Sequence, residues 1–139
     1  MQDFKKLHVW QKAHRLVLDT YAKSAHFPRE EQFGLTSQIR RAAVSIAANI
    51  AEGSSRSGDC EFAQFLRIAS GSATEVEYYA ILIADLSLLT TSDAAGIGAA
   101  AVEVRRMLSG LLASLPAPKR RRRVFVQKTR GSKLAAGKS

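Results

Sequence analysis

The amino-acid sequence predicts an all-α protein, an up-and-down antiparallel four-helix bundle with a disordered basic C-terminal tail. Three observations favour this fold. Apolar residues recur at alternating steps of three and four along four segments, which is the spacing of one helix face. The connections between these segments are short, and residues 1–115 contain no run of strand-like alternation. Amphipathic helices with short connections are typical of a bundle.

The first two helices are defined by their apolar stripes and by the residues that follow them. The first is expected from about Lys5 to Ala25, before Phe27 and Pro28. Its stripe consists of Leu7, Trp10, His14, Val17 and Tyr21, widened by Ala13, Leu16 and Thr20. The second helix is expected to begin near Leu35 and to stop at Gly53.

The middle of the second helix is unusually poor in charge. Its segment 42–51 contains no charged residue and many small ones. A helix exposed on one side of a monomer normally carries a polar stripe there. We therefore expect this helix to be covered on two sides, by its own bundle and by another subunit. The alternative is an alanine-rich face that tolerates water.

The third and fourth helices follow in the same way. The third is expected to start at Ser57, Gly58 or Asp59 and to continue without a proline to Leu89. Gly71 interrupts it, and the close approach of another helix would compensate for the cost of that glycine. The fourth helix is expected after residues 90–93 and ends where Pro116 follows Leu115.

Charge divides the chain into a neutral bundle domain, residues 1–115, and a basic tail, residues 116–139. The domain holds 12 Lys and Arg against 12 Asp and Glu, whereas the tail holds 9 Lys and Arg and no acidic residue. A block of like charge cannot collapse on itself and tends to bind a polyanion such as nucleic acid. The tail residues expected to bind it are Lys119, Arg120, Arg121, Arg122, Arg123, Lys128 and Arg130.

The tail also has other features that bear on its role. The run 124–126 adds Phe125, whose ring is suited to stacking on an unpaired base. The alternative for the whole tail is a solvated extension with no partner. A membrane-surface role is disfavoured because the basic run is not amphipathic.

Composition bounds the compartment. The single cysteine, Cys60, excludes an intramolecular disulfide and suits a reducing environment. The longest uncharged stretches, 42–51 and 107–118, are shorter than the roughly 18 apolar residues that a membrane span needs. The first twelve residues lack the apolar core of a secretory signal. We expect a cytoplasmic protein that makes no contact with membranes.

A long pattern of residues resembles the 23S rRNA intervening sequence proteins. The central part of the pattern is Phe27, Pro28, Glu31, Phe33, Gly34 and Leu35, then the runs 37–46 and 49–53. Flanking matches are the run 9–11, the pairs 61–62, 65–66, 68–69 and 71–72, and Glu75 and Glu77. The resemblance covers residues 4–89 well and the fourth helix loosely. Where the usual pattern has Pro-Ser after Ile46, this chain has Ala47 and Ala48, which predicts a straighter second helix.

The resemblance implies a four-helix bundle that assembles as a ring, typically a pentamer, without established enzymatic activity. Some members of the family are encoded within insertions in ribosomal RNA genes. A related branch serves as the accessory protein of diversity-generating retroelements, which implies a reverse transcriptase or a ribosomal component as a candidate partner. The basic tail lies outside the shared region, so that the resemblance implies nothing about it.

Several residues of the bundle are candidates for contacts. Arg40 and Arg41 project about 100° apart on a helix, so that they cannot both face the core. We expect Arg40 to be the arginine that contacts phosphate. The alternative is that these arginines form structural ion pairs with glutamates, within the bundle or between subunits. Asn49 lies among apolar seam residues, where an amide fixes register. The residues expected to act in structure or assembly are Arg41, Asn49, Glu52, Gly53, Gly71, Glu75 and Glu77.

No catalytic, metal or cofactor site is expected. Carboxylate-bridged metal sites in bundles use Glu-x-x-His pairs, and no glutamate of this chain is followed by histidine three positions later. The run 96–101 satisfies the G-x-G-x-x-A form, but it follows a helix cap and not a strand, which favours helix-packing glycines.

These observations predict a non-enzymatic, homo-oligomeric bundle, with a pentamer favoured, that binds nucleic acid. RNA is preferred to DNA. The alternative is a protein-interaction scaffold with an incidental tail.

Overall fold

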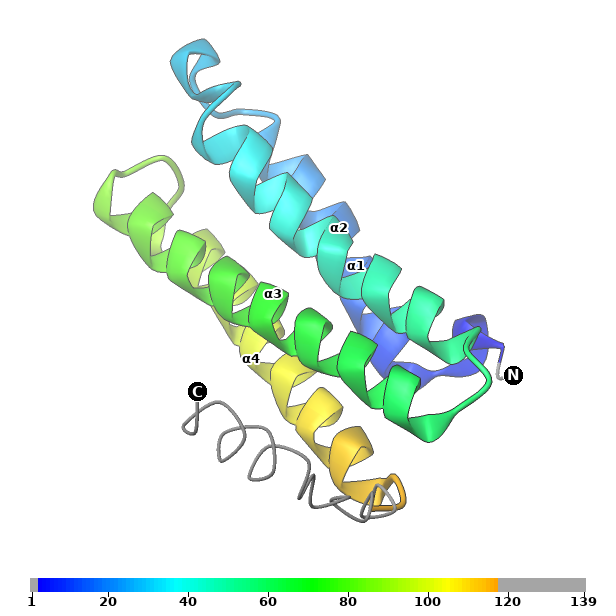
Figure 1. Cartoon of the computed structure of the whole chain (residues 1–139). Helices are drawn as coiled ribbons and strands as arrows, with labels where there is room; N and C mark the ends of the chain where they lie inside the picture. The colour runs from blue at the N-terminus through cyan, green and yellow to red at the C-terminus, as the bar shows by residue number, and fades with distance from the viewer. Residues whose placement is uncertain (1–2, 118–139) are drawn as a thin grey trace, which may run out of the picture.

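The computed structural model describes residues 3–117 and contains four α-helices that run up and down in sequence order (Figure 1). The helices are α1 (His8–Ser24), α2 (Leu35–Ser54), α3 (Asp59–Asp85) and α4 (Thr91–Ser114). Helix α1 lies beside α2 and α4, and α3 lies beside the same two helices, whereas the backbones of the diagonal pairs do not approach within 8 Å between Cα atoms. Each helix therefore lies at one corner of a four-helix bundle, which confirms the predicted fold class.

One continuous apolar core lies between the four helices. Its largest fully buried side chains include Leu16, Ile39, Ile46, Ile50, Leu66, Ile83, Ile97 and Leu108. The buried residues of α2, α3 and α4 recur at steps of three and four, as the apolar spacing of the sequence predicts. The stripe predicted for α1 is displaced, because Val9, Ala13, Leu16 and Thr20 are buried while His14 and Tyr21 are exposed. Trp10 is partly buried and packs against the core from outside.

The ends of α1 and α4 are close to those predicted. The turn before α1 is a short 3-10 helix, η1 (Phe4–Lys6), and a second one, η2 (Arg29–Glu31), lies between α1 and α2. The backbone N–H of Asp93 donates to Thr90 Oγ1 at 3.1 Å, which caps α4.

The prediction that α3 continues to Leu89 was wrong. Helix α3 ends at Asp85, and Ser87 adopts a left-handed backbone conformation with φ of 58°. The N–H of Leu88 then donates to the carbonyl oxygen of Ile83 at 3.0 Å, which closes the helix with the hydrogen bond of a Schellman motif. Because neither glycine nor proline marks this end, no residue pattern predicts it.

The predicted role of Gly53 as the stop of α2 was also wrong. Helix α2 passes through Gly53 to Ser54, and no described glycine has a positive φ. A Cβ at Gly53 would lie 2.7 Å from the Cβ of Phe65 and 3.0 Å from Cδ2 of Phe62. This position needs glycine because α2 and α3 approach each other closely there.

The Ala47 and Ala48 pair lies inside α2, which continues as one helix through this position. Within residues 3–117, no helix combines the length and the hydropathy needed to cross a membrane.

Candidate nucleic-acid interface and assembly surface

The basic tail begins at one end of the bundle. Pro116 and Ala117 lie beside the start of α3, in a hollow that Cys60 and Arg67 also line. The start of α1, the loop between α2 and α3 and the end of α4 all lie at this end (Figure 1). The tail residues predicted to bind nucleic acid lie outside the described part of the chain. These are Lys119, Arg120, Arg121, Arg122, Arg123, Lys128 and Arg130.

The charges of the neutral bundle are distributed unevenly along its axis. We define the tail half as residues 3–18, 46–71 and 103–117, and the loop half as residues 19–45 and 72–102. The tail half carries 8 Lys and Arg against 5 Asp and Glu, and the loop half carries 4 against 7. The bundle is therefore basic at the end from which the basic tail emerges and acidic at the other end.

Basic residues on α1 form part of this surface. His8, Gln11, Lys12 and Arg15 line a shallow hollow, and Lys12 Nζ lies 3.1 Å from Glu103 Oε1 on α4. Sequence reasoning missed these residues, although Lys5, Lys6, Lys12 and Arg15 stand close together in the sequence. The net charge of the whole domain is zero, so that it does not reveal this local excess of basic residues.

The structure places Arg40 in the loop half, away from the root of the tail. Its Nε donates to Ser24 Oγ at 2.8 Å, and its guanidinium lies 4.5 Å from the centre of the Tyr21 ring. These contacts join α2 to α1 and use part of the hydrogen-bonding capacity of the side chain. Nucleic-acid binding by Arg40 stays a prediction.

Arg41 and Glu52 are exposed on α2. Arg41 donates to Gln38 Oε1 at 2.7 Å, and Glu52 pairs with Arg56, which lies just after the end of α2. Within residues 3–117, neither Arg40 nor Arg41 forms an ion pair with a glutamate. The roles of Arg41 and Glu52 in assembly stay a prediction.

The two mid-helix glutamates of α3 lie in different surroundings. Arg105 on α4 donates to Glu77 Oε2 at 3.1 Å, which links α3 and α4. Glu75 is exposed. A surface pair of this kind contributes at most about 1 kcal/mol to stability, so that it positions side chains more than it holds the fold together.

A short polar chain joins α2 to α3. The Asn49 side-chain amide donates to the carbonyl oxygen of Ser45 at 2.8 Å and to its Oγ at 3.0 Å. The hydroxyls of Ser45 and Ser72 are 2.9 Å apart, and Ser72 is buried. The inter-helix contact is thus made by the two serines, and Asn49 supports it from the side.

Apolar residues remain exposed on α2 and α3. The exposed fraction is 40% for Val44 on α2, and 52% and 57% for Ile68 and Tyr78 on α3. Gly71 is exposed between the latter two, and a Cβ there would meet no atom within 4 Å. Among the described residues, no neighbouring helix approaches Gly71 closely. We call Val44, Ile68, Gly71 and Tyr78 the α2–α3 face.

The other residues considered as candidate sites make contacts within the bundle. The imidazole of His14 stacks on the indole of Trp10 at 5.0 Å. The glycines of the run 96–101 lie inside α4, where a Cβ at Gly98 would be 3.5 Å from the Cβ of Ala80. In the part of the chain that the structure describes, no three His, Cys, Asp or Glu residues are grouped as metal ligands would be.

Comparisons with known proteins agree with the fold. A crystal structure from Bacteroides thetaiotaomicron, of a protein with unknown function from the S23 ribosomal protein family, is similar with a TM-score of 0.68 and 24% sequence identity. The similarity covers 75% of this chain and 97% of that chain. No curated protein shows significant sequence similarity to the chain. The family model of the 23S rRNA-intervening sequence proteins matches residues 5–110. This protein therefore belongs to the 23S rRNA-intervening sequence protein family.

Proposed function

We propose that this protein is a non-enzymatic homo-oligomer that binds nucleic acid through its basic tail. The observation that carries the proposal is the charge of residues 116–139, which hold 9 Lys and Arg and no Asp or Glu. Such a segment displaces counterions from a polyphosphate backbone, which supplies affinity without sequence recognition. Binding of this kind needs no catalytic group.

The electrostatics of the bundle support the proposal. The tail half is itself basic, and Lys5, Lys6 and Arg15 are exposed at the start of the chain. A polyanion held by the tail would extend over a surface of the same sign. The acidic loop half would repel it, so that binding is expected at one end of the bundle.

RNA is the polyanion that we favour. The name of the family refers to 23S rRNA, which makes RNA the first nucleic acid to test. In a single strand, Phe125 would also have unpaired bases on which to stack. DNA is the second arm of the test. The resemblance adds a ribosomal component or a reverse transcriptase as a protein that works beside the same nucleic acid.

Assembly through the α2–α3 face would multiply this binding. The face exposes apolar side chains beside a glycine with open space above it, and small residues allow helices of two subunits to approach closely. We propose a ring, with five subunits as the family resemblance implies. Five tails in one particle would convert weak single contacts into high overall affinity.

The proposal is tested by measuring binding of a fluorescently labelled single-stranded RNA to the full chain by anisotropy. The test variant replaces Arg120, Arg121, Arg122 and Arg123 with glutamine. The matched control is Arg29→Gln, an exposed arginine of the loop half. We expect the fourfold variant to bind at least about tenfold more weakly, since it loses four phosphate contacts, and the control to bind as the parent does. Equal affinity of all three proteins would refute the proposal. A labelled DNA of the same sequence forms the second arm.

Assembly is tested separately by light scattering at micromolar concentration. We expect a mass several times the 15.1 kDa of one chain. Gly71→Gln places a long side chain on the α2–α3 face and should lower that mass. Gly110→Gln is the matched control, because a Cβ at Gly110 also meets nothing within 4 Å and the position is on α4. A parent protein that is monomeric throughout would contradict the assembly.

The exposed apolar face also favours a second candidate, a protein-interaction scaffold whose tail is incidental. The two candidates differ in what the fourfold variant does. A scaffold keeps its partner when the arginines are neutralised, whereas a nucleic-acid-binding protein loses its RNA.

A further inference from the structure

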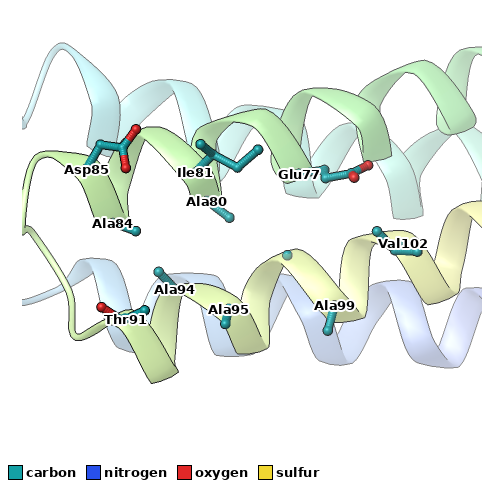
Figure 2. A pocket seen from close by; sticks show the side chains of 11 residues that line it. Glu77, Ala80, Ile81, Ala84, Asp85, Thr91, Ala94, Ala95, Ala99 and Val102 are labelled. Atoms are coloured by element: carbon teal, nitrogen blue, oxygen red, sulfur yellow. The ribbon is translucent and has the colours of Figure 1, made fainter.

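An apolar groove lies on the outer side of α3 and α4, in the loop half of the bundle. It has a volume of about 360 Å³, and its floor consists of small residues. Figure 2 shows Ala80 and Ala84 on the α3 side of the groove and Ala95 and Ala99 on the α4 side, with Ile81 and Val102 also lining it. Small side chains on both helices leave room for a large one from elsewhere.

The two ends of the groove carry acidic residues. Glu77 and Asp85 stand two helical turns apart on α3, about 12 Å at 1.5 Å per residue (Figure 2). Glu77 also contacts Arg105, whereas no ion pair is formed by Asp85 within the described residues. An apolar centre between two carboxylates matches an apolar segment between two cations.

The basic tail contains such a segment. Val124, Phe125 and Val126 follow Arg123 and precede Lys128. We propose that Phe125 docks in the α3–α4 groove of its own chain, with Arg123 near Glu77 and Lys128 near Asp85. The proposal goes beyond nucleic-acid binding and holds whether or not the tail binds a polyanion.

The length of the chain supports this placement. Helix α4 rises about 1.5 Å per residue and an extended segment about 3.3 Å, so that one residue of tail running back along α4 would cover about two of the helix. Phe125 is eight residues after Ala117 and would therefore reach the level of Ala99, at the middle of the groove. Lys128 would reach the level of residues 92–94, next to Asp85.

Three further observations support the path along α4. Ala117 precedes a proline, which favours the extended backbone that this path needs. A second hollow shares Ala99 and Val102 with the groove and continues along α4 toward Met107, in the direction of the root of the tail. The acidic loop half attracts the basic tail, and the basic tail half repels it.

The docked segment has a consequence for binding. Cations that contact the groove are not available to a polyanion. Docking and capture of a polyanion by the tail therefore compete, and a polyanion should release the segment.

Disulfide trapping in the full chain tests the proposal. All variants carry Cys60→Ser. The test variant adds Ala95→Cys and Gln127→Cys, since residue 127 would reach the level of Ala95. The control variant adds Leu18→Cys and Gln127→Cys, because Leu18 is 58% exposed at a similar level of the bundle but on α1. Mild oxidation is followed on a non-reducing gel, with no nucleic acid present.

We expect the test pair to form an intramolecular disulfide at least about tenfold faster than the control pair. Phe125→Ser and Asp85→Lys, each added to the test variant, should reduce its rate to that of the control. Heparin should do the same, an outcome that also rests on the proposed binding of polyanions by the tail, whereas the two substitutions test docking alone. Equal rates for the test and control pairs would overturn the proposal.

Two other results would also overturn it. A covalent dimer as the main product means that the groove holds the tail of a second copy. If the thiol introduced at position 95 neither oxidises nor reacts with a maleimide, another subunit covers the groove. Because RNA is absent from the assay, its result is independent of the RNA-binding test above.

Discussion

The close contact between α2 and α3 at Gly53 yields the sharpest prediction about stability. In the Gly53→Ala variant, the new Cβ would lie 2.7 Å from the Cβ of Phe65. A Cβ is fixed to its own backbone, so that rotation of the Phe65 side chain does not relieve the overlap. The two helices have to separate locally, which loosens the packing of Phe62 and Phe65 between them.

The size of the effect follows from two opposing terms. Overpacking a tightly packed site costs about 1–3 kcal/mol. Replacing a helical glycine with alanine gains up to about 1 kcal/mol, and less near the end of a helix. Gly53 is the last residue but one of α2. We therefore expect Gly53→Ala to lower the free energy of unfolding by about 1–2 kcal/mol.

Gly110→Ala is the matched control. Gly110 lies inside α4, it is exposed, and a Cβ there meets nothing within 4 Å. Only the higher helix propensity of alanine acts at this position, so that this variant should be more stable than the parent by about 0.5–1 kcal/mol. Urea unfolding followed by circular dichroism measures both, at one protein concentration because assembly makes stability depend on it. If Gly53→Ala is as stable as Gly110→Ala, the reasoning is refuted.

Three further predictions concern the contacts between and within helices. Ser72→Ala removes the hydrogen bond to Ser45 and should lower the free energy of unfolding by about 1 kcal/mol. If urea unfolds this variant and the parent at the same concentration, the bond does not stabilise the fold. Thr90→Ala removes the N-terminal cap of α4 and should lower the free energy of unfolding by about 1 kcal/mol. The backbone amides in the first turn of α4 should then exchange hydrogen faster than in the parent. A double-mutant cycle with Glu77→Gln and Arg105→Gln should give a coupling energy below about 1 kcal/mol, because both side chains are about a third exposed or more. A coupling energy of twice that size would contradict the view that this ion pair contributes little to stability.

The fold could be predicted from the sequence because apolar periodicity decides it. Helix α2 illustrates this, since Ile39, Ile46 and Gly53 stand seven residues apart, or two helical turns, and all three are buried. The end of α3 could not be predicted, because Ser87 adopts a left-handed conformation without glycine. The displaced stripe of α1 has a similar origin. Apolar size favours Trp10 as the centre of the buried face, whereas the smaller Val9 and Ala13, together with Leu16, occupy it.

The candidate site was predictable only in part. The charge of the tail is visible in the sequence, because it needs no folding to be counted. The axial separation of charge in the bundle is not visible, since it arises when distant basic residues such as Lys12 and Arg67 come to the same end. The α3–α4 groove was missed for the same reason. Its small residues come from two helices and are unremarkable in each.

The central claim is that the bundle holds shape while residues 116–139 supply the attraction for nucleic acid. The most direct test is the salt dependence of RNA affinity, compared between the full chain and a chain truncated after Leu115, whose four helices circular dichroism must first show to be intact. For the full chain, the plot of log affinity against log salt should have a slope of about −0.7 for each phosphate contact, and affinity should fall steeply between about 50 and 200 mM salt. The truncated chain should show a slope near zero and weak binding. A truncated chain with the affinity and the slope of the full chain would contradict the account.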